Sequence, residues 1–254
     1  MSMFPRVIPV LLVSDGYLVK PLRFKGEQYI GDPINAVRIF NEKQVDELLI
    51  CDIDATVKKT GVNYTLIEEI ASEAFMPVGY GGGVASAAEA RRITGIGIEK
   101  IVLGASAVMR PETVAEVSEA LGSSSTVVSV DARKRLTNGW DTFVERGRRK
   151  TGMSPAEAAR RAQDLGAGEV LVSSIDREST LAGYDLPLIE AVSQAVSVPV
   201  VALGGAGRYE DFAPALNAGA SAVAAGSMFV FNGKHRAVLI SYPTPQQVRA
   251  LSVS

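Results

Sequence analysis

Cysteine and histidine are almost missing from this chain of 254 residues. The one cysteine, Cys51, has no second cysteine with which to form an intrachain disulfide. The one histidine, His235, cannot by itself complete a zinc site or a Ser/His/Asp triad. We therefore expect neither a bound metal nor a cofactor. Any chemistry must depend on carboxylates, lysines or backbone groups.

An excess of one charge and long apolar segments are also missing. The 26 Lys and Arg residues nearly balance the 28 Asp and Glu residues, so the formal net charge is −2 and no basic tract for nucleic acid is present. The apolar run at 7–13 is too short to span a bilayer, and no small-residue cleavage site follows it. We expect a cytoplasmic protein with no nucleic-acid or membrane partner, in which an anionic ligand would need a local site.

Short apolar runs rich in Val and Ile alternate with amphipathic stretches along the chain. This alternation is typical of βα units around a parallel sheet, and eight such units in about 250 residues predict a closed barrel. We therefore predict an α/β fold with one domain, residues 1–254, a single (βα)8 TIM barrel. The predicted strands lie near residues 6–12, 47–53, 76–80, 100–104, 126–131, 169–174, 199–203 and 221–225.

Similar segments recur at an offset of about 120 residues. Repeats that keep the same order predict a barrel built from two similar (βα)4 halves. The segment CDIDAT at 51–56 recurs as SSIDREST at 173–180, MPVGYGGG at 76–83 as VPVVALGGAG at 198–207, and IVLGASAV at 101–108 as AVAAGSMF at 222–229.

Two insertions interrupt this pattern, at 20–31 and 133–151, and both come after the carboxyl end of a predicted strand. Loops at that end of a barrel form the catalytic face, so polar and Gly-containing insertions there predict a lid. In the second insertion, Asn138 and Gly139 predict a tight hairpin turn.

Glycines follow four of the predicted strands. Backbone N–H groups that no side chain shields can bind an anion, and the helices after strands 4 and 8 would add donors at their N-termini. The alternative is that these glycines only permit sharp turns, but their duplication on one face favours a ligand with a phosphate at each end. The predicted phosphate-binding residues are Gly82, Gly83, Gly104 and Ala105 in the first half, and Gly204, Gly205, Gly226 and Ser227 in the second.

Charged residues open four of the predicted strands, namely Arg6, Glu47, Lys100 and Glu169. Side chains alternate along a strand, so each of these residues shares a face with residues expected to point into the barrel. We predict that the four side chains meet inside the N-terminal rim, where two positive and two negative charges balance. They would form either a salt-bridge plug that closes the barrel floor or a gate through it.

Eight motifs occur in a characteristic order, and on them the chain resembles the HisF family, the cyclase subunit of imidazole glycerol phosphate synthase. The resemblance covers nearly the whole chain. It implies that a HisH-type glutaminase binds at the N-terminal face and supplies ammonia, which passes through the barrel to a phosphorylated small molecule. It also places the family's ammonia gate on the same four charged residues. The motifs are VSDGYLVK at 13–20, GDP at 31–33, DELLICDIDAT at 46–56, GGG at 81–83, SVDARK at 129–134, GAGEVLVSSIDRE at 166–178, GYD at 183–185 and GGAG at 204–207.

In the family, two aspartates that end strands 1 and 5 are the general acid and base of imidazole closure. Asp131 matches the second aspartate, but Leu12 stands at the position of the first, and an alkyl side chain cannot transfer a proton. The related HisA isomerases also use two carboxylates, so Leu12 argues against that activity as well. Lys20 matches a catalytic lysine on the family's mobile loop, although an isolated loop lysine can also be simply solvated. Ser179 replaces a glycine that relatives commonly have near one phosphate.

Two functions are compatible with these features. The first is a paralogue with reduced cyclase activity that relays ammonia toward amidination of an acetamido sugar in surface-polysaccharide and lipopolysaccharide biosynthesis. The alternative is a functional cyclase-lyase that forms imidazole glycerol phosphate in histidine biosynthesis, with Asp131 as its main acid/base. Leu12 favours the paralogue, because cyclisation requires two carboxylates whereas a conduit requires a glutaminase dock, a gate and an apolar bore.

Overall fold

The computed structural model describes residues 5–233 and 235–251, and it forms a closed barrel of eight parallel strands. Closure occurs where β1 pairs with β12, with Arg6 opposite Ala222, and where β7 pairs with β10. The predicted TIM barrel is therefore confirmed. Its strands are β1 (Arg6–Ser14), β4 (Leu48–Asp52), β5 (Val78–Gly81), β6 (Lys100–Leu103), β7 (Thr126–Lys134), β10 (Glu169–Ser174), β11 (Val200–Leu203) and β12 (Ala222–Ala225).

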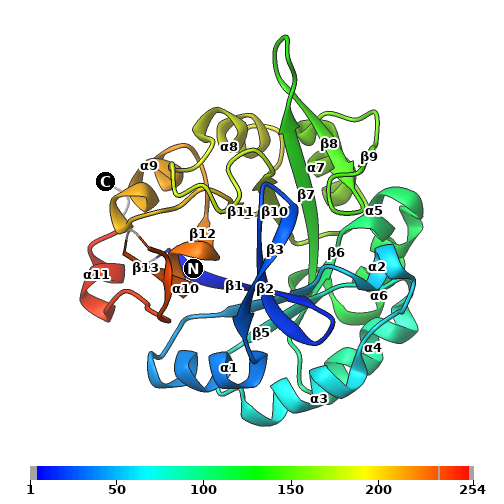
Figure 1. Cartoon of the computed structure of the whole chain (residues 1–254). Helices are drawn as coiled ribbons and strands as arrows, with labels where there is room; N and C mark the ends of the chain where they lie inside the picture. The colour runs from blue at the N-terminus through cyan, green and yellow to red at the C-terminus, as the bar shows by residue number, and fades with distance from the viewer. Residues whose placement is uncertain (1–4, 234, 252–254) are drawn as a thin grey trace.

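A ring of helices surrounds the strands, as Figure 1 shows. Local signals start several of them: Pro33 and Pro155 occupy first-turn positions, and Ser154 forms a capping box with Glu157 at the start of α7. The helices that return the chain from one barrel strand toward the next, together with the last helix, are α1 (Pro33–Glu42), α3 (Tyr64–Glu73), α4 (Ala87–Ile96), α6 (Glu112–Leu121), α7 (Pro155–Asp164), α8 (Leu186–Ser193), α9 (Phe212–Asn217) and α11 (Pro245–Arg249).

Both halves begin with a nine-residue strand that continues into an antiparallel hairpin. In the first half, β1 pairs with β2 (Tyr17–Leu22), which pairs with β3 (Lys25–Gly31). In the second half, β7 pairs with β8 (Trp140–Val144), which pairs with β9 (Arg149–Lys150). These hairpins are the two predicted insertions. The last pair of the β7–β8 ladder is Lys134 with Trp140, so Asn138 and Gly139 lie in the longer connection between these two residues and not in a tight turn.

Short elements complete the chain. They are the helices α2 (Ala55–Lys58), α5 (Ala105–Met109) and α10 (Ser227–Val230), the 3₁₀ turns Ser123–Ser125 and Tyr209–Asp211, and the hairpin strands β13 (Phe231–Asn232) and β14 (Ala237–Val238). No helix among the described residues is long and apolar enough to cross a membrane.

The barrel interior and the layer between strands and helices form two separate apolar cores. Along β1, Ile8 and Val10 belong to the interior core, whereas Val7 and Leu11 belong to the outer one. This alternation confirms that Arg6 and Leu12 share the inward face of β1. The other interior residues are Leu49, Val102, Val127, Leu171, Val201, Ala222 and Ala224, with Leu12, Cys51 and Leu203 packed against them.

Candidate functional site

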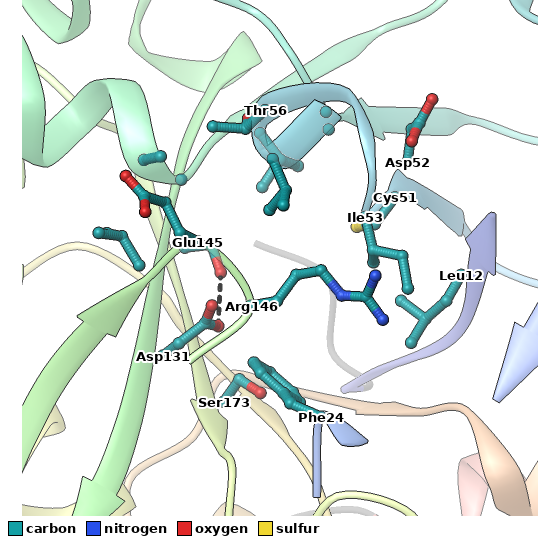
Figure 2. Close-up of a pocket in the computed structure, with 18 of the residues that line it drawn as sticks. Leu12, Phe24, Cys51, Asp52, Ile53, Thr56, Asp131, Glu145, Arg146 and Ser173 are labelled. Carbon is teal, nitrogen blue, oxygen red and sulfur yellow. Dashed lines mark hydrogen bonds between the residues drawn. The ribbon is translucent and has the colours of Figure 1, made fainter. Parts of the chain in front are cut away.

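A cavity of about 170 Å³ opens at the carboxyl ends of the barrel strands. Its floor is apolar, where Val10, Val102 and Leu171 of the interior core reach it. Its walls carry polar groups from strand ends and from both insertions. Figure 2 shows Asp131 and Ser173 on one side of this cavity, with Leu12 and Cys51 on the other. The carboxyl ends of the strands thus form the candidate site, as expected for a barrel of this type.

Asp131 projects into the cavity from β7 and accepts a hydrogen bond from the Ser129 hydroxyl at 3.3 Å. Burial raises the pKa of Asp131 to about 7, an effect that the Ser129 hydrogen bond opposes and the nearby charge of Glu178 reinforces. A carboxyl group with a pKa close to neutrality can both accept and donate a proton. Asp131 therefore has the properties of a general acid or base.

Leu12 lies on β1, across the cavity from Asp131. It pairs with Cys51 across β1 and β4, and both side chains line the cavity. Burial raises the pKa of the Cys51 thiol to about 12, so this thiol stays protonated near neutral pH and takes no part as a base. Neither Leu12 nor Cys51 therefore provides a proton-transfer group at neutral pH.

Glu178 is a carboxylate in the cavity wall that sequence reasoning did not assign. It is buried, and burial raises its pKa, although the nearby charge of Lys20 opposes this shift. It lies two residues after Asp176 and directly before Ser179, the residue that replaces a glycine common in relatives, and this neighbouring substitution was the only signal for it. Asp52 and Glu145 also line the cavity, but Glu178 is the carboxylate whose charge raises the pKa of Asp131.

Lys20 is buried on β2 rather than solvated on a loop. Its ammonium donates a hydrogen bond to the carbonyl of Val10 at 2.9 Å. Burial lowers the pKa of Lys20, while the charge of Glu178 opposes that shift. In this conformation the predicted catalytic lysine lies at the strand ends of the second half, beside Gly226.

The glycine cradle of the first half faces the cavity. Gly82, Gly83, Gly104 and Ala105 all line it. A Cβ at Gly82 would overlap the backbone of Asp52, and its φ of +131° also favours glycine, so this glycine is required by local geometry. By contrast, a Cβ at Gly104 would meet nothing within 4 Å. The structure therefore leaves the Gly104 side of this cradle open.

The glycine cradle of the second half is filled by the protein itself. Lys20 occupies the space above Gly226, where a Cβ would overlap its ammonium. The Ser227 hydroxyl donates to the Ser179 hydroxyl at 2.7 Å, and Ser179 in turn contacts Glu178. The remaining predicted residues of this cradle, Gly204 and Gly205, are packed against backbone of the 174–183 segment. The two cradles, although duplicated in sequence, differ in accessibility.

Arg146 and Phe24 cover the cavity and were not identified from the sequence. Arg146 lies across the cavity in Figure 2 and donates to Asp54 at 2.9 Å and to Glu27. Because Arg146 belongs to the second insertion and Glu27 to the first, this ion pair joins the two hairpins. Phe24, at the turn between β2 and β3, points into the cavity below Arg146 in this view. The insertions together therefore form the predicted lid.

The four charged residues at the opposite end form a closed ring of ion pairs. Arg6 donates to both Glu47 and Glu169, and the Lys100 ammonium lies 3.0 Å from Glu47 and 2.8 Å from Glu169. Burial alone would raise the pKa of Glu169, but hydrogen bonds and charges from Arg6 and Lys100 outweigh it and lower that pKa. The Glu169 carboxylate is consequently charged at neutral pH. The ring closes one end of an apolar interior whose other end is the floor of the cavity.

The fold and the site define the class: a (βα)8 barrel with glycine cradles at the carboxyl ends of its strands and a closed ring of charges at the opposite rim. Residues 6–236 match the family model described as histidine biosynthesis protein, and the chain belongs to this family.

Full-length relatives within that family carry the name HisF. A provisionally named imidazole glycerol phosphate synthase subunit HisF of Leptospira interrogans is 44% identical, over 97% of this chain and 98% of its own length. The provisionally named subunit hisF2 of Pseudomonas aeruginosa is 47% identical, over 94% of this chain and 95% of its own. The imidazole glycerol phosphate synthase subunit HisF of Thermococcus gammatolerans is 40% identical over 88% of each chain. The resemblance drawn from the motifs is confirmed.

Proposed function

We propose that this chain is a HisF-type subunit that receives ammonia from a HisH-type glutaminase at its N-terminal face and passes it through the barrel to the cavity. The ring of Arg6, Glu47, Lys100 and Glu169 supports this proposal, because it stands at the mouth of an apolar interior that leads to the opposite cavity. Neutral ammonia can cross an apolar region that excludes ions. Relatives named as subunits of imidazole glycerol phosphate synthase support a multi-subunit assembly.

The same proposal includes reduced cyclase activity. Leu12 is the observation that supports reduced cyclase activity, because it provides no proton-transfer group opposite Asp131 in the cavity. Ammonia delivered to the cavity would then serve another acceptor, and the family resemblance suggests amidination of an acetamido sugar in lipopolysaccharide biosynthesis. The open cradle at Gly82, Gly83, Gly104 and Ala105 is the proposed site for a phosphate of the bound ligand.

Ammonia-dependent turnover of the bisphosphate ribonucleotide of histidine biosynthesis tests the reduced cyclase activity. We expect little turnover by the unmodified chain and a gain of at least about 100-fold in the Leu12→Asp variant, the size of a typical acid/base contribution. Leu12→Asn is the matched control, since it is similar in size but transfers no proton. Robust turnover by the unmodified chain would contradict the proposal.

The alternative is a functional cyclase-lyase that uses a different second carboxylate. Glu178 favours it, because this residue lies in the cavity wall and burial raises its pKa, as it does for Asp131. Under this alternative, both Asp131→Asn and Glu178→Gln would abolish an activity that the unmodified chain already has. Rescue of a histidine auxotroph that lacks its own cyclase would support the same conclusion.

A further inference from the structure

A basic groove lies outside the cavity, between the two insertions. It consists of two adjoining hollows of about 460 Å³ and 580 Å³ that share Arg23, Lys25 and Arg133. In a chain whose net charge is −2, this gathering of positive side chains is local. The cationic side chains that line the groove are Arg23, Lys25, Arg133, Arg146 and Arg148, and the carboxylates are Glu27 and Asp176.

Both carboxylates of the groove already have partners. Glu27 accepts from Arg146, and Asp176 accepts a hydrogen bond from the backbone N–H of Lys134 at 2.7 Å. Within residues 5–233 and 235–251, no carboxylate lies at ion-pair distance from Arg133. The groove therefore has a net positive charge that its own acidic residues do not balance, which favours an anionic ligand.

Packing holds the guanidinium of Arg133 in a defined orientation. It stacks on the ring of Phe143, with its central carbon 4.4 Å from the ring centroid. It also lies against Gly147, where a Cβ would approach within 2.7 Å of the Arg133 Nη2 atom. Stacking uses the face of the guanidinium and leaves N–H groups along its edge, which form the planar fork that recognises a phosphoryl group.

The groove is continuous with the cavity, because Phe24 and Arg146 line both. Inside the cavity, only the first-half cradle is open, while Lys20 and Ser179 fill the second. With the second cradle occupied in this conformation, a ligand bound in the open cradle has one adjoining open region for its other phosphoryl group. The basic groove is the adjoining positive region on the same face.

We propose that this groove binds the second phosphoryl group of the ligand, with Arg133 as its main contact and Arg23 and Arg148 as further cations. The ligand class is a small molecule with two separated phosphoryl groups. The position of the first group rests on the proposed function, whereas the groove itself does not. Under this arrangement, the insertions act as a part of the binding site as well as a cover.

Binding measured by calorimetry at low salt tests the groove, with inorganic phosphate and the bisphosphate ribonucleotide of histidine biosynthesis as probes. We expect Arg133→Met to remove one of two phosphate sites and to weaken the ribonucleotide at least about tenfold, as loss of a charge-assisted hydrogen bond does. Arg91 is an exposed arginine on α4, so Arg91→Met is the control. It should change neither the number of phosphate sites nor the affinity for the ribonucleotide. Tm values of each variant check that the fold is intact.

A second variant separates the groove from the inner cradle. Gly104→Asp places a negative charge in the open cradle without a steric clash, and it should remove the other phosphate site. If Gly104→Asp has no effect while Arg133→Met weakens the binding of both probes, the phosphate site in the open cradle is rejected and the phosphate site in the groove is supported. If Arg133→Met affects inorganic phosphate alone, the groove binds free anions and the ligand assignment is overturned. Unchanged binding in Arg133→Met, or no binding of either probe to the unmodified chain, overturns the proposal.

Discussion

Replacement of Arg6 by methionine tests how strongly the N-terminal ring depends on each of its members. Arg6 donates to both Glu47 and Glu169, whose side chains are only 8% exposed, so the variant leaves two buried carboxylates with Lys100 alone. Removal of one partner from a buried ion pair costs about 3–5 kcal/mol. We expect about 2–3 kcal/mol, because Arg6 is itself 30% exposed and Lys100 still contacts both carboxylates. For a chain of this size, the decrease in Tm would be roughly 4–12 °C.

The loss should also depend on pH, because Arg6 and Lys100 lower the pKa of Glu169 against the effect of burial. A carboxyl group with a lowered pKa stabilises the fold above its unfolded pKa of about 4.3, and this contribution is lost as pH falls through the lowered value. Without Arg6, burial shifts the pKa of Glu169 upward again, so the variant binds a proton near pH 4 and its deficit shrinks. The loss should therefore be complete at pH 7 and smaller at pH 4.

Thermal unfolding followed by circular dichroism at both pH values provides the measurement. Arg38→Met is the matched control, because Arg38 forms an ion pair with Glu73 on the surface, where solvent screens it. The reasoning is refuted by an equal decrease in Tm at pH 4 and pH 7, or by a decrease as large in Arg38→Met as in Arg6→Met.

Three further outcomes are expected. Asp131→Asn should stabilise the chain by about 1–3 kcal/mol at pH 8 and by less at pH 5, since burial raises the pKa of Asp131 to about 7 and the cost of its burial builds up between its unfolded pKa of about 3.9 and that value; urea unfolding at both pH values checks this. Gly205→Ala should cost about 2–4 kcal/mol because its Cβ would overlap the Gly183 carbonyl, whereas Gly139→Ala, also at positive φ but in open space, should cost about 1 kcal/mol by the same assay. The purified chain should co-elute with a HisH-type glutaminase from the same genome and stimulate glutamine hydrolysis, and Lys100→Met should reduce that stimulation; absence of both effects would contradict the predicted docking face.

Most of the fold was predictable because its signals are local. Strand runs, helix caps and the alternation of side chains along β1 follow from residues near one another in sequence. The convergence of Arg6 and Lys100 on the same carboxylates followed from alternation combined with barrel closure. The prediction of a tight turn at Asn138 was wrong, because the connection is longer. The β7–β8 register is set by pairing along the whole hairpin and not by the turn residues alone.

The candidate site was less predictable, because its character depends on contacts between residues far apart in the chain. Periodicity and motifs were enough to predict the barrel, its two similar halves, the charged ring and the substitution at Leu12. Only the tertiary structure decided that Lys20 fills one cradle and leaves the other open, and that Arg146 joins the two insertions over the cavity. Two similar glycine patterns become different sites because a side chain from a distant hairpin occupies one of them, and no local pattern records where such a hairpin folds.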